Sequence, residues 1–246
     1  APTDPSILIA ILNGKACNFR CLKRYNEAIS LFDKALSIKN NKTSWFNKGD
    51  IFLTLNKYDE AIKCLDHGLE IDPQSSTALC VKGEALFMLG SYKEALLHLN
   101  KAINLNPKQV DAIFIKGLIL HGTSNFSEAL KCFDSVIELN PTDFQAWYYK
   151  GKIKSQEKSE LEALECYNNA LSINPNHLDS HKMKGLSLTQ LRLYHDAINS
   201  YNFILENKPD DTIVCELMAE LLLVTGNYKT NASHSGLVRQ NNEAEF

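Results

Sequence analysis

The stretch that decides the fold is residues 45–73, WFNKGDIFLTLNKYDEAIKCLDHGLEIDP. Its apolar residues form two stripes, in residues 45–55 and 61–71, and each stripe has the spacing of an α-helix. The polar pair at 56–57 turns the chain between the stripes. Pro73 ends the second stripe because proline disfavours helix in the residue before it. The stretch therefore predicts an antiparallel pair of helices.

The same pattern recurs along the chain every 34 residues, and once after 33. One column of small residues holds Ala16, Gly49, Gly83, Gly117, Gly151, Gly185 and Ala219. A second column holds Ala28, Ala61, Ala95, Ala129, Ala163 and Ala197. Small residues in both helices let the helices cross closely. One hairpin alone leaves an apolar flank bare, so neighbouring hairpins are expected to stack and bury it.

With helix–turn–helix units of this length, the sequence resembles the tetratricopeptide repeat family. Its Lys-Gly pairs at the small column resemble those of prokaryotic, particularly archaeal, arrays of this family. The resemblance implies an all-α, right-handed superhelical solenoid of antiparallel helix hairpins. The expected repeats are 9–41, 42–75, 76–109, 110–143, 144–177 and 178–211, followed by a final helix at 212–225. We expect residues 1–228 to form a single solenoid and the polar residues 229–246 to be a disordered tail.

In tetratricopeptide proteins the first helix of each hairpin lines a concave groove that holds peptides. The resemblance therefore implies a peptide-binding groove beside the small column. The expected groove residues are Phe46, Asn47, Cys80, Val81, Glu84, Phe87, Phe114, Ile115, Leu118, Tyr148, Tyr149 and Lys152, with Met88 beside them. Their apolar and aromatic character favours a partner with an apolar or aromatic segment, such as an amphipathic helix. The alternative is that curvature of the stack buries some of these side chains against neighbouring repeats.

A clamp motif and a column of lysines give further information about the ligand. Some family members capture a C-terminal carboxylate with a clamp of Lys, Asn and Arg, but here only Asn47 matches the clamp, so we do not expect that ligand.

Lysines precede most small residues, at Lys15, Lys48, Lys82, Lys116, Lys150 and Lys184. We expect their alkyl stems to cover adjacent helices while the ammonium groups reach water or acids of the next repeat. A basic ladder for an acidic partner is the alternative.

Repeat five and the last helix depart from the pattern. In repeat five, Lys154 and Glu160 replace apolar residues, and we expect them to form an ion pair across the turn; a local weak point is the alternative.

The final helix has few polar residues, although solenoid caps normally present a polar outer face. We therefore expect the tail, a missing repeat or a second copy to cover residues 212–225. Self-association there would use Leu217, Leu221 and Val224.

The composition and motifs of the chain exclude several classes of function. The chain has 26 basic and 29 acidic residues, and this balance argues against nucleic-acid and membrane-surface binding. Seven scattered cysteines without a Cys-x-x-Cys motif suggest buried thiols in a reducing cytoplasm rather than a disulfide framework. No signal peptide or membrane-spanning run is evident. No catalytic motif is present, and His177 and His181 lack a third metal ligand, so we expect no enzyme, cofactor or metal.

Three functional hypotheses follow. The leading one is a cytoplasmic scaffold or adaptor that binds a peptide or helix of a partner protein in the groove. The second is a non-catalytic recognition domain of a larger enzyme. The third is a self-assembling structural element joined through residues 212–225, which would form a homodimer.

Overall fold

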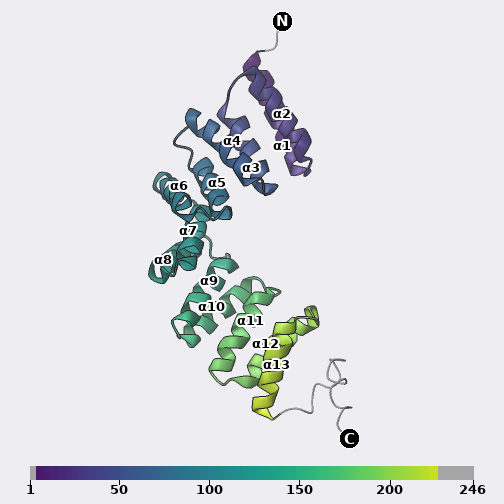
Figure 1. Cartoon of the computed structure of the whole chain (residues 1–246), viewed down its shortest axis with the longest axis vertical. Helices are drawn as coiled ribbons and strands as arrows, with labels where there is room; N and C mark the ends of the chain where they lie inside the picture. The colour runs from purple at the N-terminus through teal and green to yellow at the C-terminus, as the bar shows by residue number, and fades with distance from the viewer. Residues whose placement is uncertain (1–3, 227–246) are drawn as a thin grey trace. The chain divides into compact units, whose positions relative to one another are not determined.

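A computed structural model describes residues 4–226, in which there are thirteen α-helices and no strand (Figure 1). The helices are α1 (Pro5–Cys21), α2 (Tyr25–Ile38), α3 (Lys42–Thr54), α4 (Tyr58–Ile71), α5 (Ser76–Met88), α6 (Tyr92–Leu105), α7 (Val110–Gly122), α8 (Phe126–Leu139), α9 (Phe144–Gln156), α10 (Glu160–Ile173), α11 (Leu178–Gln190), α12 (Tyr194–Asn207) and α13 (Thr212–Thr225). The predicted all-α solenoid of helix hairpins is confirmed. The tail predicted at 229–246 lies outside the described residues.

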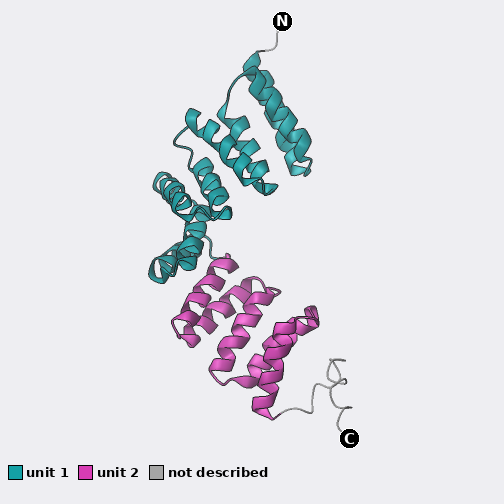
Figure 2. Ribbon diagram, in the orientation of Figure 1, with its two compact units in different colours: residues 1–141 teal, residues 142–246 magenta. Residues whose placement is uncertain are grey.

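The chain divides into two compact units (Figure 2). Unit 1, residues 1–141, holds the four hairpins from α1 to α8. Unit 2, residues 142–246, holds the hairpins α9–α10 and α11–α12, followed by α13. The division falls next to the predicted boundary between the fourth and fifth repeats, although the sequence pattern did not single out that boundary.

Close crossing of the two helices in each hairpin depends on the small column. A Cβ atom added to Gly117 would lie 2.9 Å from the ring of Phe133, and one added to Gly151 would lie 2.6 Å from the ring of Tyr167. The large residue on the second helix thus fills the space that a side chain on the first helix would need. This contact confirms the role predicted for the small column.

Each hairpin turns through a residue in the left-handed conformation, five residues before the alanine of the second helix. The φ angles of these residues lie between 57° and 77°. They are Lys23, Asn56, Gly90, Ser124, Lys158 and Arg192. At each turn two backbone bonds close the first helix; for example, Asn56 N–H donates to the Leu53 carbonyl and Lys57 N–H donates to the Phe52 carbonyl. This is the Schellman arrangement, in which glycine is the favoured left-handed residue.

Glycine at the strained turns should stabilise the protein. A left-handed conformation costs an ordinary residue about 1–2 kcal/mol. Glycine avoids this cost, but it loses more backbone entropy on folding, which offsets part of the gain in stability. We expect Lys158→Gly and Arg192→Gly each to raise the free energy of unfolding by about 1 kcal/mol. Asn56→Gly is the matched control and should gain less, because asparagine tolerates this conformation. Chemical denaturation measures the difference, and equal gains at all three positions would contradict the explanation.

The lysine column fastens adjacent repeats in unit 1. The Lys48 ammonium lies 2.6 Å from an Asp33 carboxylate oxygen, and that of Lys82 lies 2.5 Å from Asp66. Lys116 donates to the Asn100 side-chain oxygen at 2.8 Å. These partners lie on the second helix of the preceding repeat. The predicted packing role is therefore confirmed for Lys48 and Lys82, with the acid on the preceding rather than the following repeat.

The ion pair predicted in repeat five is wrong. Lys154 pairs instead with Glu162 at 3.0 Å and Glu157 at 3.4 Å. Glu160 is buried and accepts a hydrogen bond from the Ser155 hydroxyl at 3.2 Å. Because Glu160 begins α10 and points into the turn, a hydroxyl on the neighbouring helix satisfies its carboxylate, and the lysine turns to the more exposed acids.

All seven cysteines are free thiols, and four of them are buried. Burial raises the pKa of Cys64 to about 11 and that of Cys80 to about 12. Cys21 is exposed, which differs from the expectation that the thiols are buried. The buried cysteines act as small apolar packing residues.

Candidate functional site

The first helices of unit 1 contact one another directly, α3 with α5 and α5 with α7, in addition to contacting their second helices. Their side chains turned away from the second helices therefore form a continuous face. The predicted groove residues were assigned to such a face in repeats two to five, and the structure separates most of them into three groups.

Two predicted groove residues are buried inside the stack. Cys80 is 3% exposed and Ile115 is 7% exposed, and both belong to a core cluster with Leu99 and Ile119. Neither side chain can contact a ligand at the surface. Their assignment to an open groove is corrected, because the alternative of packing between neighbouring repeats holds for these two.

A second group leans onto the second helix of its own hairpin. Phe46 packs over Gly68. The rings of Phe114 and Phe133 lie with their centroids 5.8 Å apart. In unit 2 the Tyr148 ring lies 6.3 Å from that of Tyr167. These three aromatics are half-buried and support the hairpins as well as bordering the face.

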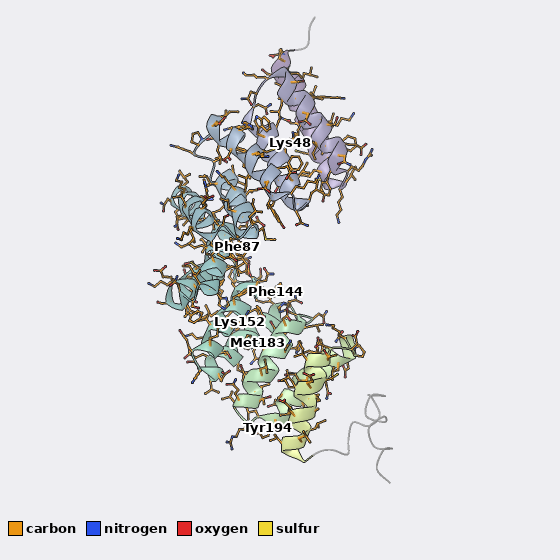
Figure 3. The ribbon with its side chains drawn as sticks, viewed as in Figure 1. Lys48, Phe87, Phe144, Lys152, Met183 and Tyr194 are labelled. Carbon is orange, nitrogen blue, oxygen red and sulfur yellow. The ribbon has the colours of Figure 1, made fainter. Side chains whose placement is uncertain are left out.

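The third group forms an exposed surface on α5 and α7, which we call the α5–α7 face. It consists of Val81, Glu84, Phe87, Met88 and Leu118. Met88 is 51% exposed and the others are half-buried (Phe87 is labelled in Figure 3). The face combines four apolar side chains with one carboxylate.

The carboxylate of Glu84 has no ion-pair partner within residues 4–226. Burial raises its pKa above the ordinary value, and the negative charges of Asp111 and Asp50 raise it further. Asp50 is itself paired with Arg20, whereas Asp111 is exposed. Asp111 was not among the predicted groove residues, which all lie within four residues of the small column, whereas Asp111 lies six residues before Gly117.

Glu84 should give stability a recognisable pH dependence. Because its pKa is raised by folding, the folded protein holds a proton that the unfolded chain has lost, so stability falls as pH rises through the window above the ordinary pKa. We expect Glu84→Gln to raise the melting temperature at pH 7 and to have a smaller effect near pH 4. Thermal unfolding across this range tests the prediction, with Glu94→Gln on exposed α6 as the control. A gain that does not depend on pH would contradict it.

The opposite end of unit 1 satisfies its polar groups internally. Ser44 donates to the Asn13 side-chain oxygen at 2.7 Å in a buried contact between α1 and α3. Asn47, the single match to the carboxylate clamp, donates to the Thr43 carbonyl at 2.8 Å within its own helix. Beside Asn47, Arg20 pairs with Asp50. This polar, paired surface is a poorer place for an apolar segment than the α5–α7 face.

In unit 2 the matching position carries a cation. The ammonium of Lys152 lies 5.6 Å from the ring centroid of Tyr148 and 5.2 Å from that of Tyr149 (Lys152 is labelled in Figure 3). The Tyr148 ring also lies 5.1 Å from that of His177. Burial raises the pKa of Tyr148 to about 12, with a further contribution from Asp179, so its phenol stays neutral. The first-helix surface of unit 2 is therefore aromatic with one lysine held over two rings.

Helix α13 ends the described chain. Of the residues predicted for self-association, Leu221 is 2% exposed and packs in the core with Tyr201 and Ile204. Its place in an association surface is corrected, because it lies on the side of α13 that faces α12. Leu217 is half-buried, and Val224 is exposed.

No group of three or more His, Cys, Asp or Glu residues that could hold a metal ion occurs in residues 4–226. None of the helices described is both long and apolar enough to pass through a bilayer.

These features define a helical-repeat protein, in which stacked hairpins present the faces of their first helices. Family models agree with this class. Residues 144–177 match the tetratricopeptide repeat, residues 21–102 match anaphase-promoting complex, cyclosome, subunit 3, and residues 126–153 match the protein prenyltransferase alpha subunit repeat. Together these matches support a tetratricopeptide repeat protein, with one such repeat identified at residues 144–177. Such repeats are typically non-catalytic.

Solved structures share this fold at low sequence identity. The APC/C hetero-tetramer Cut9–Hcn1 matches at 17% identity with a TM-score of 0.73 over 87% of this chain. YrrB, a TPR protein with an unusual peptide-binding site, matches at 22% identity with a TM-score of 0.64, over 76% of this chain and 97% of its own. Pseudomonas aeruginosa PilF matches at 16% identity with a TM-score of 0.79, over 88% and 99% of the two chains.

The chain spans 43% of the length of the Cut9–Hcn1 chain that it matches. A search of curated proteins returned no significant sequence match.

Proposed function

We propose that the protein is an interaction scaffold whose α5–α7 face binds a short segment of a partner polypeptide, with an apolar side chain next to a basic one. The observation that carries this proposal is the position of Glu84, a half-buried carboxylate without an ion pair in residues 4–226, on the same side of α5 as Val81, Phe87 and Met88, with Leu118 at the matching position of the neighbouring α7. YrrB supports a polypeptide ligand, since it is a protein of the same fold that has a peptide-binding site.

The physical reasoning rests on complementarity. Apolar surface that leaves water on binding contributes about 25 cal/mol per Å². A lysine or arginine placed against Glu84 would neutralise a carboxylate that burial and two acidic neighbours disfavour. Charge pairing of this kind mainly supplies specificity, while the apolar contacts supply affinity. The seven free thiols support the cytoplasm as the proposed compartment.

The test uses a displayed library of random peptides selected on the full chain. We expect selected peptides to combine an aromatic or aliphatic residue with a nearby lysine or arginine. The double variant Met88→Ala with Leu118→Ala should weaken their binding at least about tenfold, because these side chains supply contact area but lie outside the hairpin cores. Leu97→Ala is the control, since Leu97 is 54% exposed on α6 and belongs to no first helix.

Two results would contradict the proposal. One is selected peptides that bind the double variant and the wild type equally well. The other is binding lost through Leu97→Ala. Titration calorimetry with circular dichroism on the same samples separates lost contacts from lost helical structure.

A further inference from the structure

The residue in the small column is buried in every complete hairpin but exposed in α13. A second helix covers the column at Ala16, Gly49, Gly83, Gly117, Gly151 and Gly185. Helix α13 occupies the first-helix place of a seventh unit, and its Ala219 is exposed. Gly226 then has a φ of 68°, the same left-handed conformation as the turn residues of the six hairpins. Helix α13 is thus a first helix whose small residue no described second helix covers.

The six hairpins show what kind of helix fits such a face. Every second helix presents an alanine followed four residues later by a large apolar residue. The pairs are Ala28 and Phe32, Ala61 and Leu65, Ala95 and Leu99, Ala129 and Phe133, Ala163 and Tyr167, and Ala197 and Tyr201. Both members meet the small column: a Cβ on Gly49 would lie 2.9 Å from Leu65 Cγ and 3.3 Å from the Ala61 carbonyl oxygen. The face of α13 therefore suits an antiparallel helix with this alanine–apolar pair.

The sequence identifies which segment carries the pair. Continuing the 34-residue spacing from Ala197 and Tyr201 leads to Asn231 and Ser235, so the residues after Gly226 lack it. The six second helices carry it but are already packed on their own first helices. Helix α13 itself carries it, as Ala219 and Leu223, and the Leu223 side chain is 56% exposed.

We propose that α13 pairs antiparallel with α13 of a second copy of the chain, so that each helix acts as the second helix of the other. The contact surface is Cys215, Ala219, Leu222 and Leu223, which share one side of the helix at spacings of four, seven and eight residues. It replaces the predicted set in which Leu221 was included. This inference is independent of the function proposed for the α5–α7 face.

The pairing is self-complementary. In a symmetric antiparallel pair centred on Ala219, Cys215 lies opposite Leu223 of the partner subunit, and Glu216 lies opposite an apolar position rather than another carboxylate. Such an isologous contact uses the same surface on both copies and closes as a dimer. One 14-residue helix per copy is a small interface. We therefore expect weak association, with a dissociation constant of roughly 10–100 μM.

Sedimentation velocity of the full chain from about 1 to about 300 μM brackets this range. We expect the mass to rise from monomer to dimer, and Leu223→Glu to weaken association at least about tenfold, since it buries an unpaired charge. Leu161→Glu, at another exposed leucine of unit 2, should leave the dimer unchanged. A monomer at every concentration overturns the proposal, as does a dimer that Leu223→Glu leaves intact.

A cysteine at the centre of the pair gives a second measurement that does not depend on stability. With Cys17 and Cys21 replaced by serine, and Cys215 replaced by alanine so that its place in the contact surface stays apolar, Ala219→Cys should form an intermolecular disulfide in oxidised glutathione, whereas Leu161→Cys should not. If residues 227–246 or a helix of another protein occupied α13 instead, the chain would stay monomeric and position 219 would not cross-link. That result overturns the proposal.

Discussion

Replacing Tyr167 by alanine is expected to lower the free energy of unfolding of unit 2 by about 3–5 kcal/mol, the usual cost of removing a fully buried aromatic ring. The Tyr167 side chain is 0% exposed and lies against Gly151 on the facing helix. The glycine cannot fill the space left by the ring, so a cavity remains. Denaturant unfolding followed by circular dichroism measures the loss.

Tyr167→Phe provides the matched control. The Tyr167 hydroxyl is buried and forms no hydrogen bond with any group in residues 4–226. Removing a buried hydroxyl that lacks a partner eliminates a desolvation cost without losing a bond. We expect Tyr167→Phe to be neutral or slightly stabilising. A loss comparable to that of Tyr167→Ala would show that the hydroxyl, rather than the ring, holds the hairpin together.

The second large effect is expected at Gly185, where alanine should destabilise the protein although alanine favours helix. A Cβ there would lie 2.8 Å from Cζ and 2.9 Å from Cδ1 of the Tyr201 ring. Overpacking against a rigid ring costs about 1–3 kcal/mol, whereas the gain in helix propensity is at most about 1 kcal/mol. The net change should therefore be a loss of stability.

Gly14→Ala is the opposite case within the same chain. Gly14 lies inside α1, and a Cβ at this position would meet no atom within 4 Å. Only the helix-propensity term applies, so we expect a gain of roughly 0.5–1 kcal/mol. Thermal unfolding of both variants tests whether Gly185→Ala lowers the stability and Gly14→Ala raises it. If Gly185→Ala stabilised the protein as well, the small column would have no role in close packing.

The sequence was sufficient to predict the helix hairpins because their determinants are local and repeated. A small residue, an alanine and a helix-ending proline recur at fixed intervals, and each acts within a few residues of its position. The left-handed turns were not predicted at Lys158 and Arg192, because long basic side chains do not favour that conformation. Both residues are exposed, and the backbone hydrogen bonds that close each turn hold them in this conformation.

The candidate site was predictable only in outline. The repeat pattern indicates which face of a helix a residue occupies, but it does not show how far the neighbouring helix covers that face. Cys80, Ile115 and Leu221 were assigned to surfaces and are buried for this reason. The partner of Lys154 was missed because its choice between Glu160 and Glu162 depends on side-chain geometry at the turn. The sequence likewise did not show that burial and the charges of Asp111 and Asp50 raise the pKa of Glu84, because these effects depend on how the helices pack.

The most direct test of the central claim, that a polypeptide binds on the first helices of unit 1, is site-specific photo-cross-linking with a selected peptide. A benzophenone amino acid would replace the half-buried Leu118 on α7 in one sample and the more exposed Leu97 on α6 in another. We expect a covalent adduct from position 118 and none from position 97. An adduct from position 97 alone would place the ligand on the second helices and contradict binding on the first helices.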